Sequence, residues 1–179
     1  MKDFFRHNRK AAVAGLILMI VFSLVFGVNR SIDRLANKVE KLYLSSDTKY
    51  GSVQKDIRKF YGYLNEMYSE ASEYGDNIAL GCAVAELKNS IDSPYSIGKI
   101  VQSAYETAQI TYNRLMNTDD ISENDKKNII VCFSELQALS MRLKNNEDYN
   151  EAAKAYNKAL NSFPAVIFDL IHIPAVVFE

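Results

Sequence analysis

The chain has 179 residues, 48% of them apolar, which is enough for one domain with a real core and short for two. The formal net charge is −1, and four of the 21 basic residues lie within the first ten positions, so there is no basic face for a phosphate backbone and no nucleic-acid partner is expected. Seven glycines and three prolines leave few tight turns, which favours long helices over a many-stranded sheet.

Residues 1–10 form a basic amino-terminal flank, and residues 11–28, AAVAGLILMIVFSLVFGV, follow without a charge. As a helix this run spans about 27 Å, close to the hydrocarbon thickness of a bilayer, so we expect it to anchor the chain in a lipid bilayer as a single-pass transmembrane segment. A cleavable signal peptide is the alternative, with Val25-Phe26-Gly27 as the cleavage pattern. The length of the run and the lack of a following Ala-x-Ala favour retention.

The charges beside this run bear on its orientation. Four lysines and arginines precede it and four follow it within residues 30–41, so the count alone does not decide. The amino-terminal set is denser, with Arg9 and Lys10 next to the apolar run. This favours a cytoplasmic amino terminus and places the bulk of the chain outside the cytoplasm.

Apolar residues spaced three and four apart predict helices along the rest of the chain. The anchor continues through Ile32 to Leu42 until SSDTKYGS breaks it, and the clearest amphipathic helix then runs from Val53 to Tyr74. A shorter helix covers LGCAVAELKNSI. Its apolar residues, like those around the second cysteine in IIVCFSEL, suggest that Cys82 and Cys132 are small buried side chains, although a disulfide between them is also conceivable.

Three more helices are predicted towards the carboxy terminus. Ser93 as N-cap with Pro94 in the first turn starts one that reaches about Asn117. Ser122 with Asp125 resembles a capping box that starts the next, and a kink or short turn at residues 144–148 separates it from the last. Repeated spacings of four and three favour antiparallel packing at about 20°. The predicted fold is all-α: an amino-terminal transmembrane helix followed, in residues 29–179, by an antiparallel up-and-down bundle of about four helices.

The stretch YNEAAKAYNKALNSFP, residues 149–164, repeats a Tyr-Asn pair after seven residues. Tyr149, Tyr156 and Phe163 share one face, which helix packing explains. Asn150 and Asn157 lie one position round, either as solvated amides or as hydrogen-bonding groups that fix register across a helix seam. Pro164 ends the helix near Ser162 and begins an apolar tail, residues 164–179, which we expect to cap the open end of the bundle; a return to the membrane surface and a partner's groove are the alternatives.

The sequence offers no recognisable catalytic or metal site. The two histidines, His7 and His172, lie outside the predicted bundle helices, so no Glu-x-x-His pair of a di-iron site is present, and the cysteines form no spaced zinc-binding pair. His172 is read as a local contact of Asp169, and the acidic residues near Glu70 as a solvated face. No cofactor, metal or catalytic residue is therefore predicted.

The spacing Tyr-Asn, five residues, Tyr-Asn, five residues, Phe-Pro, followed by an apolar tail that closes on Phe-Glu, resembles the carboxy-terminal signature of the LemA family. The chain departs from that family where SVQKDIRKFYGYL replaces an Arg-Arg-x-Asp-Leu-like stretch, and where His172-Ile173-Pro174 replaces a glycine-containing turn. It therefore resembles a divergent member.

The resemblance implies a bacterial single-pass membrane protein with a helical-bundle domain and no catalytic activity of its own. The expected function is that of an anchored interaction or scaffold protein with a partner in the membrane or envelope; a homo-oligomer is also possible. The alternative is a regulatory or accessory subunit of a membrane enzyme such as a membrane protease. A third hypothesis, an enzyme in its own right, would need a cofactor that the sequence does not advertise. The residues assigned a structural or interaction role are Tyr149, Asn150, Tyr156, Asn157, Phe163 and Pro164.

Overall fold

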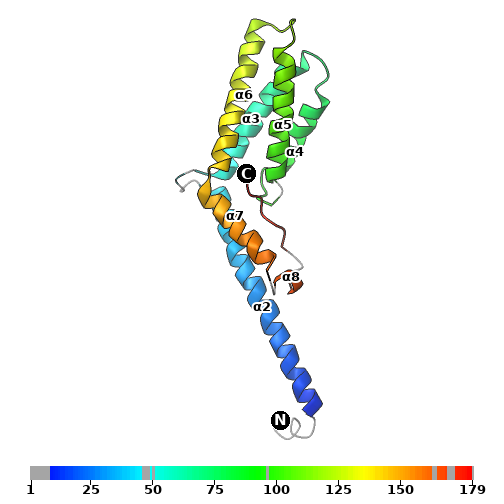
Figure 1. Cartoon of the computed structure of the whole chain (residues 1–179), viewed down its shortest axis with the longest axis vertical. Coiled ribbons are helices and arrows are strands. Elements are labelled where there is room, and N and C mark those ends of the chain that lie inside the picture. Colours follow the sequence, from blue (N-terminus) through cyan, green and yellow to red (C-terminus); the bar gives the residue numbers. More distant parts are fainter. Residues whose placement is uncertain are drawn as a thin grey trace.

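The computed structural model describes residues 9–45, 49, 51–95, 97–162, 165–168 and 172–178. Every regular element within these ranges is an α-helix, which confirms the all-helical prediction for the described part of the chain (Figure 1). The helices are α2 (Arg9–Leu44), α3 (Val53–Ser72), α4 (Ile78–Ser90), α5 (Ile97–Met116), α6 (Glu123–Lys144), α7 (Glu147–Leu160) and α8 (Ala165–Phe168).

Helix α2 is one unbroken helix of 36 residues, as the continuous apolar spacing predicted. Its amino-terminal half projects from the rest of the protein (Figure 1). Apart from the half-buried Val25, its large apolar side chains between Val13 and Phe26 are 41–69% exposed. Its carboxy-terminal half buries Ile32, Val39 and Tyr43. Among the described residues, α2 is the one helix long and apolar enough to cross a membrane, and none of its apolar window is covered by protein.

Helices α3, α4, α5 and α6 pack against one another at the end of the molecule away from the amino terminus (Figure 1). The main contacts join α3 to α6, α4 to α5 and α5 to α6, with a smaller contact between α3 and α4. The stripe predicted from Val53 to Tyr74 is confirmed within α3, where its members line the buried face: Val53, Ile57, Phe60, Leu64, Met67 and Ala71. Its last member, Tyr74, follows the end of the helix and is half-buried. Each large apolar side chain buried in this way contributes roughly 1.5–3 kcal/mol relative to exposure.

Helix α7 runs back along the carboxy-terminal half of α2, outside the group formed by α3 to α6 (Figure 1). A short turn, rather than a kink, separates it from α6, because α6 ends at Lys144 and the Asn146 side chain accepts a hydrogen bond from the Tyr149 N–H at 3.2 Å. Helix α7 ends at Leu160, two residues before the predicted end.

The α6 cap was predicted in part. Ser122 is the N-cap and its hydroxyl accepts the Asp125 N–H at 3.1 Å. The reciprocal bond of a capping box is replaced by Tyr74, whose hydroxyl accepts the Ser122 N–H at 3.4 Å and donates to the Asp125 carboxylate. The Ser122 hydroxyl also donates to the Asp125 carboxylate at 2.6 Å, and the bonds that this carboxylate accepts from Ser122 and Tyr74 lower the pKa of Asp125.

Two predictions about α4 and α5 were wrong. Cys82 is exposed rather than buried, because α4 buries Leu80, Ala83, Val84 and Leu87 and thereby turns Cys82 to the other side; Cys132 is buried, and both thiols are free. Helix α5 begins at Ile97 rather than at Pro94. In a helix the Pro94 carbonyl would accept the N–H four residues on; here it accepts the Val176 N–H at 3.2 Å.

Candidate functional site

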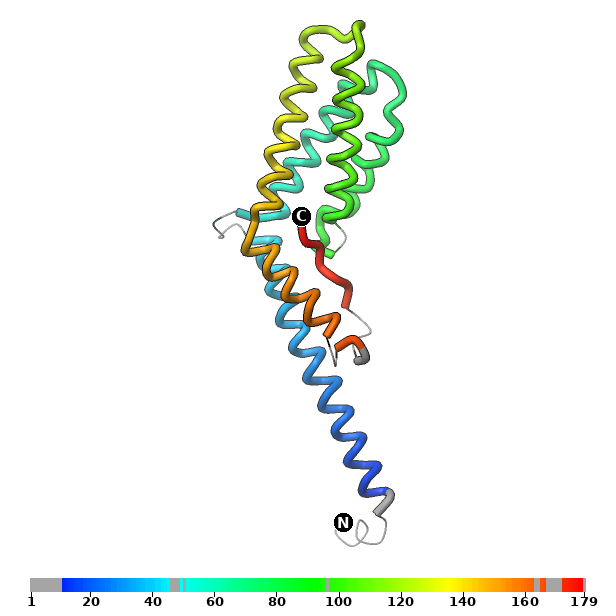
Figure 2. The backbone as a smooth tube through the Cα atoms, in the orientation of Figure 1, coloured from blue at the N-terminus to red at the C-terminus, as the bar shows by residue number. Residues whose placement is uncertain are grey.

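The described end of the tail, residues 172–178, has no regular secondary structure and lies against α7 as it runs towards the near ends of α5 and α6 (Figure 2). Ala175 and Phe178 are buried along this path. This segment is called the C-terminal strap below. Both asparagines of the repeated Tyr-Asn pair bind it, so the repeat has a shared structural role.

Asn157 holds the strap through a two-way contact with one residue. Its amide nitrogen donates to the Ala175 carbonyl at 2.6 Å, and its amide oxygen accepts the Ala175 N–H at 2.8 Å. The side chain thus satisfies both backbone groups of Ala175 in the way that a neighbouring strand would. Asn157 binds only the backbone of residue 175, and the buried position there suits a small side chain such as alanine.

Asn150 joins three segments and is only 6% exposed. Its amide nitrogen donates to the carbonyls of Leu143 and Lys144 at 3.1 and 3.0 Å, and its oxygen accepts the Phe178 N–H at 3.0 Å. The two carbonyls belong to the last turn of α6, where carbonyls lack the N–H four residues on; the Leu143 carbonyl also accepts the Asn146 N–H at 3.2 Å. Asn150 therefore caps α6, orients α7 and fixes the end of the strap.

The spacing of the repeat matches the spacing of its targets. Seven residues separate Asn150 from Asn157, which is a rise of about 10.5 Å along a helix. Three residues separate Ala175 from Phe178, which is about 10 Å along an extended segment. A helix with asparagines two turns apart can therefore hold an extended chain at every third residue without strain in either.

The two tyrosines of the repeat are also buried. Tyr156 binds the strap directly, and Tyr149 binds Pro94, whose carbonyl also binds the strap. The Tyr156 hydroxyl donates to the Ile173 carbonyl at 3.0 Å, and the Tyr149 hydroxyl to the Pro94 carbonyl at 3.4 Å. The Tyr149 ring also lies 5.7 Å, centroid to centroid, from Phe178. Burial raises the pKa of the Tyr149 hydroxyl, so it remains a proton donor at any physiological pH.

Gly98 makes room for the strap at the start of α5. A Cβ atom on Gly98 would lie 1.7 Å from Cγ1 of Val176, a separation that no pair of non-bonded carbon atoms tolerates. The Val176 N–H bonds to the Pro94 carbonyl, so the strap is drawn against α5 as well as α7. Glycine is thus the one residue that fits at position 98 while the strap is in place.

A second contact fixes the start of the strap to α2. His172 Nε2 lies 3.0 Å from Asp33 Oδ1, and the His172 side chain is 15% exposed. The predicted local partner Asp169 lies outside the described residues. The strap thus connects α2, α7 and α5.

An open groove lies beside the strap, with a volume of about 790 Å³. Its walls come from α5, the end of α6, Asn157 of α7 and the strap itself. The lining combines tyrosine rings at Tyr95 and Tyr105 with the charged groups of Lys99, Glu106 and Lys144. Such a mixed, open surface suits a protein segment better than a small apolar ligand, which needs an enclosed cavity.

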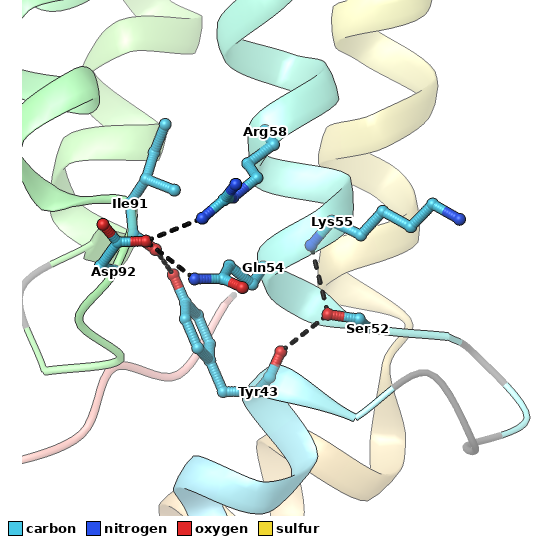
Figure 3. Close-up of polar contacts among 7 residues, drawn as sticks. All are labelled: Tyr43, Ser52, Gln54, Lys55, Arg58, Ile91 and Asp92. Atoms are coloured by element: carbon cyan, nitrogen blue, oxygen red, sulfur yellow. Dashed lines mark hydrogen bonds and ion pairs between the residues drawn. The ribbon is translucent and has the colours of Figure 1, made fainter.

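The junction between α2 and the other helices is held by backbone groups (Figure 3). The Tyr43 hydroxyl donates to the Ile91 carbonyl at 2.5 Å, and the Ser52 hydroxyl donates to the Tyr43 carbonyl at 3.0 Å. The Ser52 oxygen also accepts the Lys55 N–H at 3.2 Å as the N-cap of α3. Burial, and then the nearby Asp92 carboxylate, raise the pKa of Tyr43.

Asp92 adds a solvent-exposed contact at this junction. Its Oδ1 atom accepts hydrogen bonds from Gln54 at 2.9 Å and Arg58 at 3.0 Å (Figure 3). The Arg58 and Asp92 side chains are 60% and 82% exposed, so this ion pair contributes little to stability.

A buried carboxylate lies elsewhere between α3 and α6. The Asp56 side chain is 5% exposed and its Oδ2 atom is 3.1 Å from Nε of Arg142. Burial raises the pKa of Asp56 more than the Arg142 guanidinium lowers it. Arg142 also borders a second, smaller cavity of about 470 Å³ between these helices.

The structure thus brings together Tyr149, Asn150, Tyr156 and Asn157, whereas Phe163 and Pro164 lie outside the described residues. Neither sequence interpretation of the asparagines was complete. They are not free solvated amides, and their partners are the strap and the α6 terminus rather than a facing helix seam. Sequence reasoning missed Gly98, Ala175 and Phe178, because the strap is bound through its backbone groups and the need for glycine at 98 arises from the distant Val176.

Within the described ranges, no three His, Cys, Asp or Glu side chains come together as a metal site would require. Comparison with known proteins finds no matching family model, no matching curated protein and no matching solved structure. The class that the fold defines is accordingly a helical protein with one candidate amino-terminal membrane helix.

Proposed function

We propose that this chain is a membrane-anchored interaction or scaffold protein of the LemA type, without catalytic activity of its own. Residues 11–28 hold it in a bacterial membrane, and residues 29–179 lie outside the cytoplasm. In this proposal α3 to α6 form an antiparallel up-and-down bundle. The contacts of α3 with α6 and of α4 with α5 support that architecture.

The exposed apolar half of α2 supports the anchoring. A helix that is apolar all round and uncovered by protein is unstable in water and stable in a hydrocarbon layer, where its backbone groups remain satisfied internally. The Tyr-Asn spacing and the apolar tail support the family assignment, because the asparagines of that signature have a defined task here.

The groove beside the strap carries the interaction role. It is the larger of the two cavities described above, most of its lining belongs to α5, the end of α6 and the strap beyond Ile173, and it offers aromatic rings beside charges of both signs. Interfaces are enriched in tyrosine, with polar groups at their rim. The partner we expect is a protein of the membrane or envelope.

Site-specific photo-crosslinking tests this role. A benzophenone side chain at Gln102, exposed in the groove, is compared in the native membrane with one at Glu86, exposed on α4 away from it. We expect one discrete crosslinked product from Gln102, which disappears when Asn157→Ala loosens the groove wall, and none from Glu86. Equal products at both positions, or none at Gln102, would contradict the proposal.

A further inference from the structure

Helix α8 lies beside α2, close to the level at which α2 emerges from its uncharged run (Figure 1). Ala165 of α8 is buried against the protein, at 4% exposure, while Val166 is 63% exposed. Ile173, at the start of the strap, is also 63% exposed. Two large apolar side chains therefore face outwards at the same end of the folded part.

The height of this surface can be estimated from the contact between His172 and Asp33. Asp33 follows Val28, the last residue of the uncharged run, by five positions, which is about 7.5 Å of helix. The headgroup layer on each side of a bilayer's hydrocarbon core is about 5–7 Å thick. Because His172 Nε2 is 3.0 Å from Asp33, the neighbouring Ile173 stands at the outer edge of that layer when residues 11–28 span the core.

Protein begins to cover α2 at the same level. Val28 is half-buried against the core and Ile32 is 2% exposed, whereas the large apolar side chains from Val13 to Leu24 are exposed. Arg30 and Arg34 are exposed in this region, where guanidinium groups can reach lipid phosphates. The exposed apolar pair thus lies beside a helix that is itself leaving lipid, with cations at headgroup height.

We propose that Val166 of α8, together with Ile173, enters the headgroup region of the bilayer leaflet from which α2 emerges. This second lipid contact rests on the proposed anchoring through residues 11–28. Its apolar area is small beside that of the span, so it orients the protein rather than retaining it. Two separate contacts with one surface restrict the tilt of α3 to α6 over the membrane.

The absence of tryptophan from the sequence allows a direct test. Three full-length variants, Val166→Trp, Leu18→Trp and Ile78→Trp, each carry a single tryptophan at an exposed position, excited at a wavelength that tyrosine does not absorb. Leu18 lies within the span, and Ile78 starts α4 at the end of the molecule away from α8 (Figure 1). Each variant is reconstituted in phosphatidylcholine and phosphatidylglycerol vesicles, with and without bromine on the acyl chains.

We expect bromine to quench Leu18→Trp strongly, to quench Val166→Trp partly with a blue-shifted emission, and to leave Ile78→Trp unchanged. Quenching of Leu18→Trp with Val166→Trp behaving like Ile78→Trp would overturn the second contact and leave the anchoring intact. Loss of quenching at Leu18→Trp would overturn both. Helix content from circular dichroism verifies folding. If Val166→Trp does not fold, Ile173→Trp serves in its place, with a nitroxide attached to the lipid headgroup as the quencher.

Discussion

Asn157 and Ala175 exchange two hydrogen bonds through a single side-chain amide, at 2.6 and 2.8 Å, across 18 residues of sequence. Backbone pairing of this kind normally requires a second strand. Here one helix residue performs it, so the C-terminal strap is held without any β-structure.

Asn157→Ala should lower the free energy of unfolding by about 1–3 kcal/mol, because both backbone groups of the buried Ala175 lose their partner. For a chain of this size the melting temperature falls by roughly 2–4 °C per kcal/mol. Circular dichroism melts in detergent measure the change. Lys154→Ala, an exposed position on the same helix, is the control and should leave the melt within about 0.5 kcal/mol of the native value. Equal melting temperatures for the two variants would refute this role of Asn157.

Gly98→Ala should release the strap, because the added Cβ would meet Val176 at 1.7 Å. The amides of Val176 and Phe178 should then exchange hydrogen faster, since their acceptors on Pro94 and Asn150 are no longer in reach. Gly62→Ala is the matched control. No atom lies within 4 Å of its new Cβ, so it should stabilise α3 by up to about 1 kcal/mol. If the Val176 amide exchanges hydrogen as slowly in Gly98→Ala as in the unsubstituted protein, the position of the strap does not depend on glycine at 98.

Arg142→Gln should change the pH dependence of stability through Asp56. The folded-state pKa of Asp56 is raised above 3.8, so its contribution to stability is fully present below about pH 3.8 and is lost as pH rises through the folded pKa. Removing the Arg142 guanidinium takes away the largest lowering influence, so the pKa should rise further and the loss should extend to higher pH. Urea titrations across the acid range measure this.

The controls for this prediction are Arg58→Gln, whose ion pair is exposed, and the double variant Asp56→Asn with Arg142→Gln. Arg58→Gln should leave the pH dependence of the free energy of unfolding unchanged. The double variant should not show the additional loss of stability with rising pH that Arg142→Gln alone produces. A slope that persists in the double variant would assign the effect to another group.

Cys82 provides a natural probe of membrane orientation, because it is exposed while Cys132 is buried. Burial, together with the Glu66 carboxylate, raises the pKa of Cys132 to about 12, so it should react with maleimide only after unfolding. If the folded part lies outside the cytoplasm, a membrane-impermeant maleimide should label Cys82 in wall-stripped intact cells. Labelling of Cys82 that requires lysis would place this part inside and reverse the proposed topology.

The helices were predictable because their apolar positions recur every three or four residues, and the α3 stripe from Val53 to Ala71 is buried as expected. The strap was not, because its contacts run through backbone groups that leave no mark on side-chain pattern. Asn157 would bind any small residue at 175 in the same way. Gly98 was equally hidden, since its need arises from Val176, which is distant in sequence. Cys82 was mispredicted because α4 carries apolar residues on more than one face, so its run did not reveal which side is buried.

Because α2 is unbroken, it fixes the rotational orientation of the folded part about the axis of this helix. No turn separates the uncharged run from Tyr43 near the carboxy-terminal end of α2. The Tyr43 hydroxyl is hydrogen-bonded to the Ile91 carbonyl. A rotation of the amino-terminal part of α2 about its own axis therefore rotates the groove by the same angle. One residue inserted between Val28 and Asn29 would turn the groove by about 100° and raise it by about 1.5 Å. In the proposed membrane arrangement, the length of α2 would thus set which face the folded part presents to a partner.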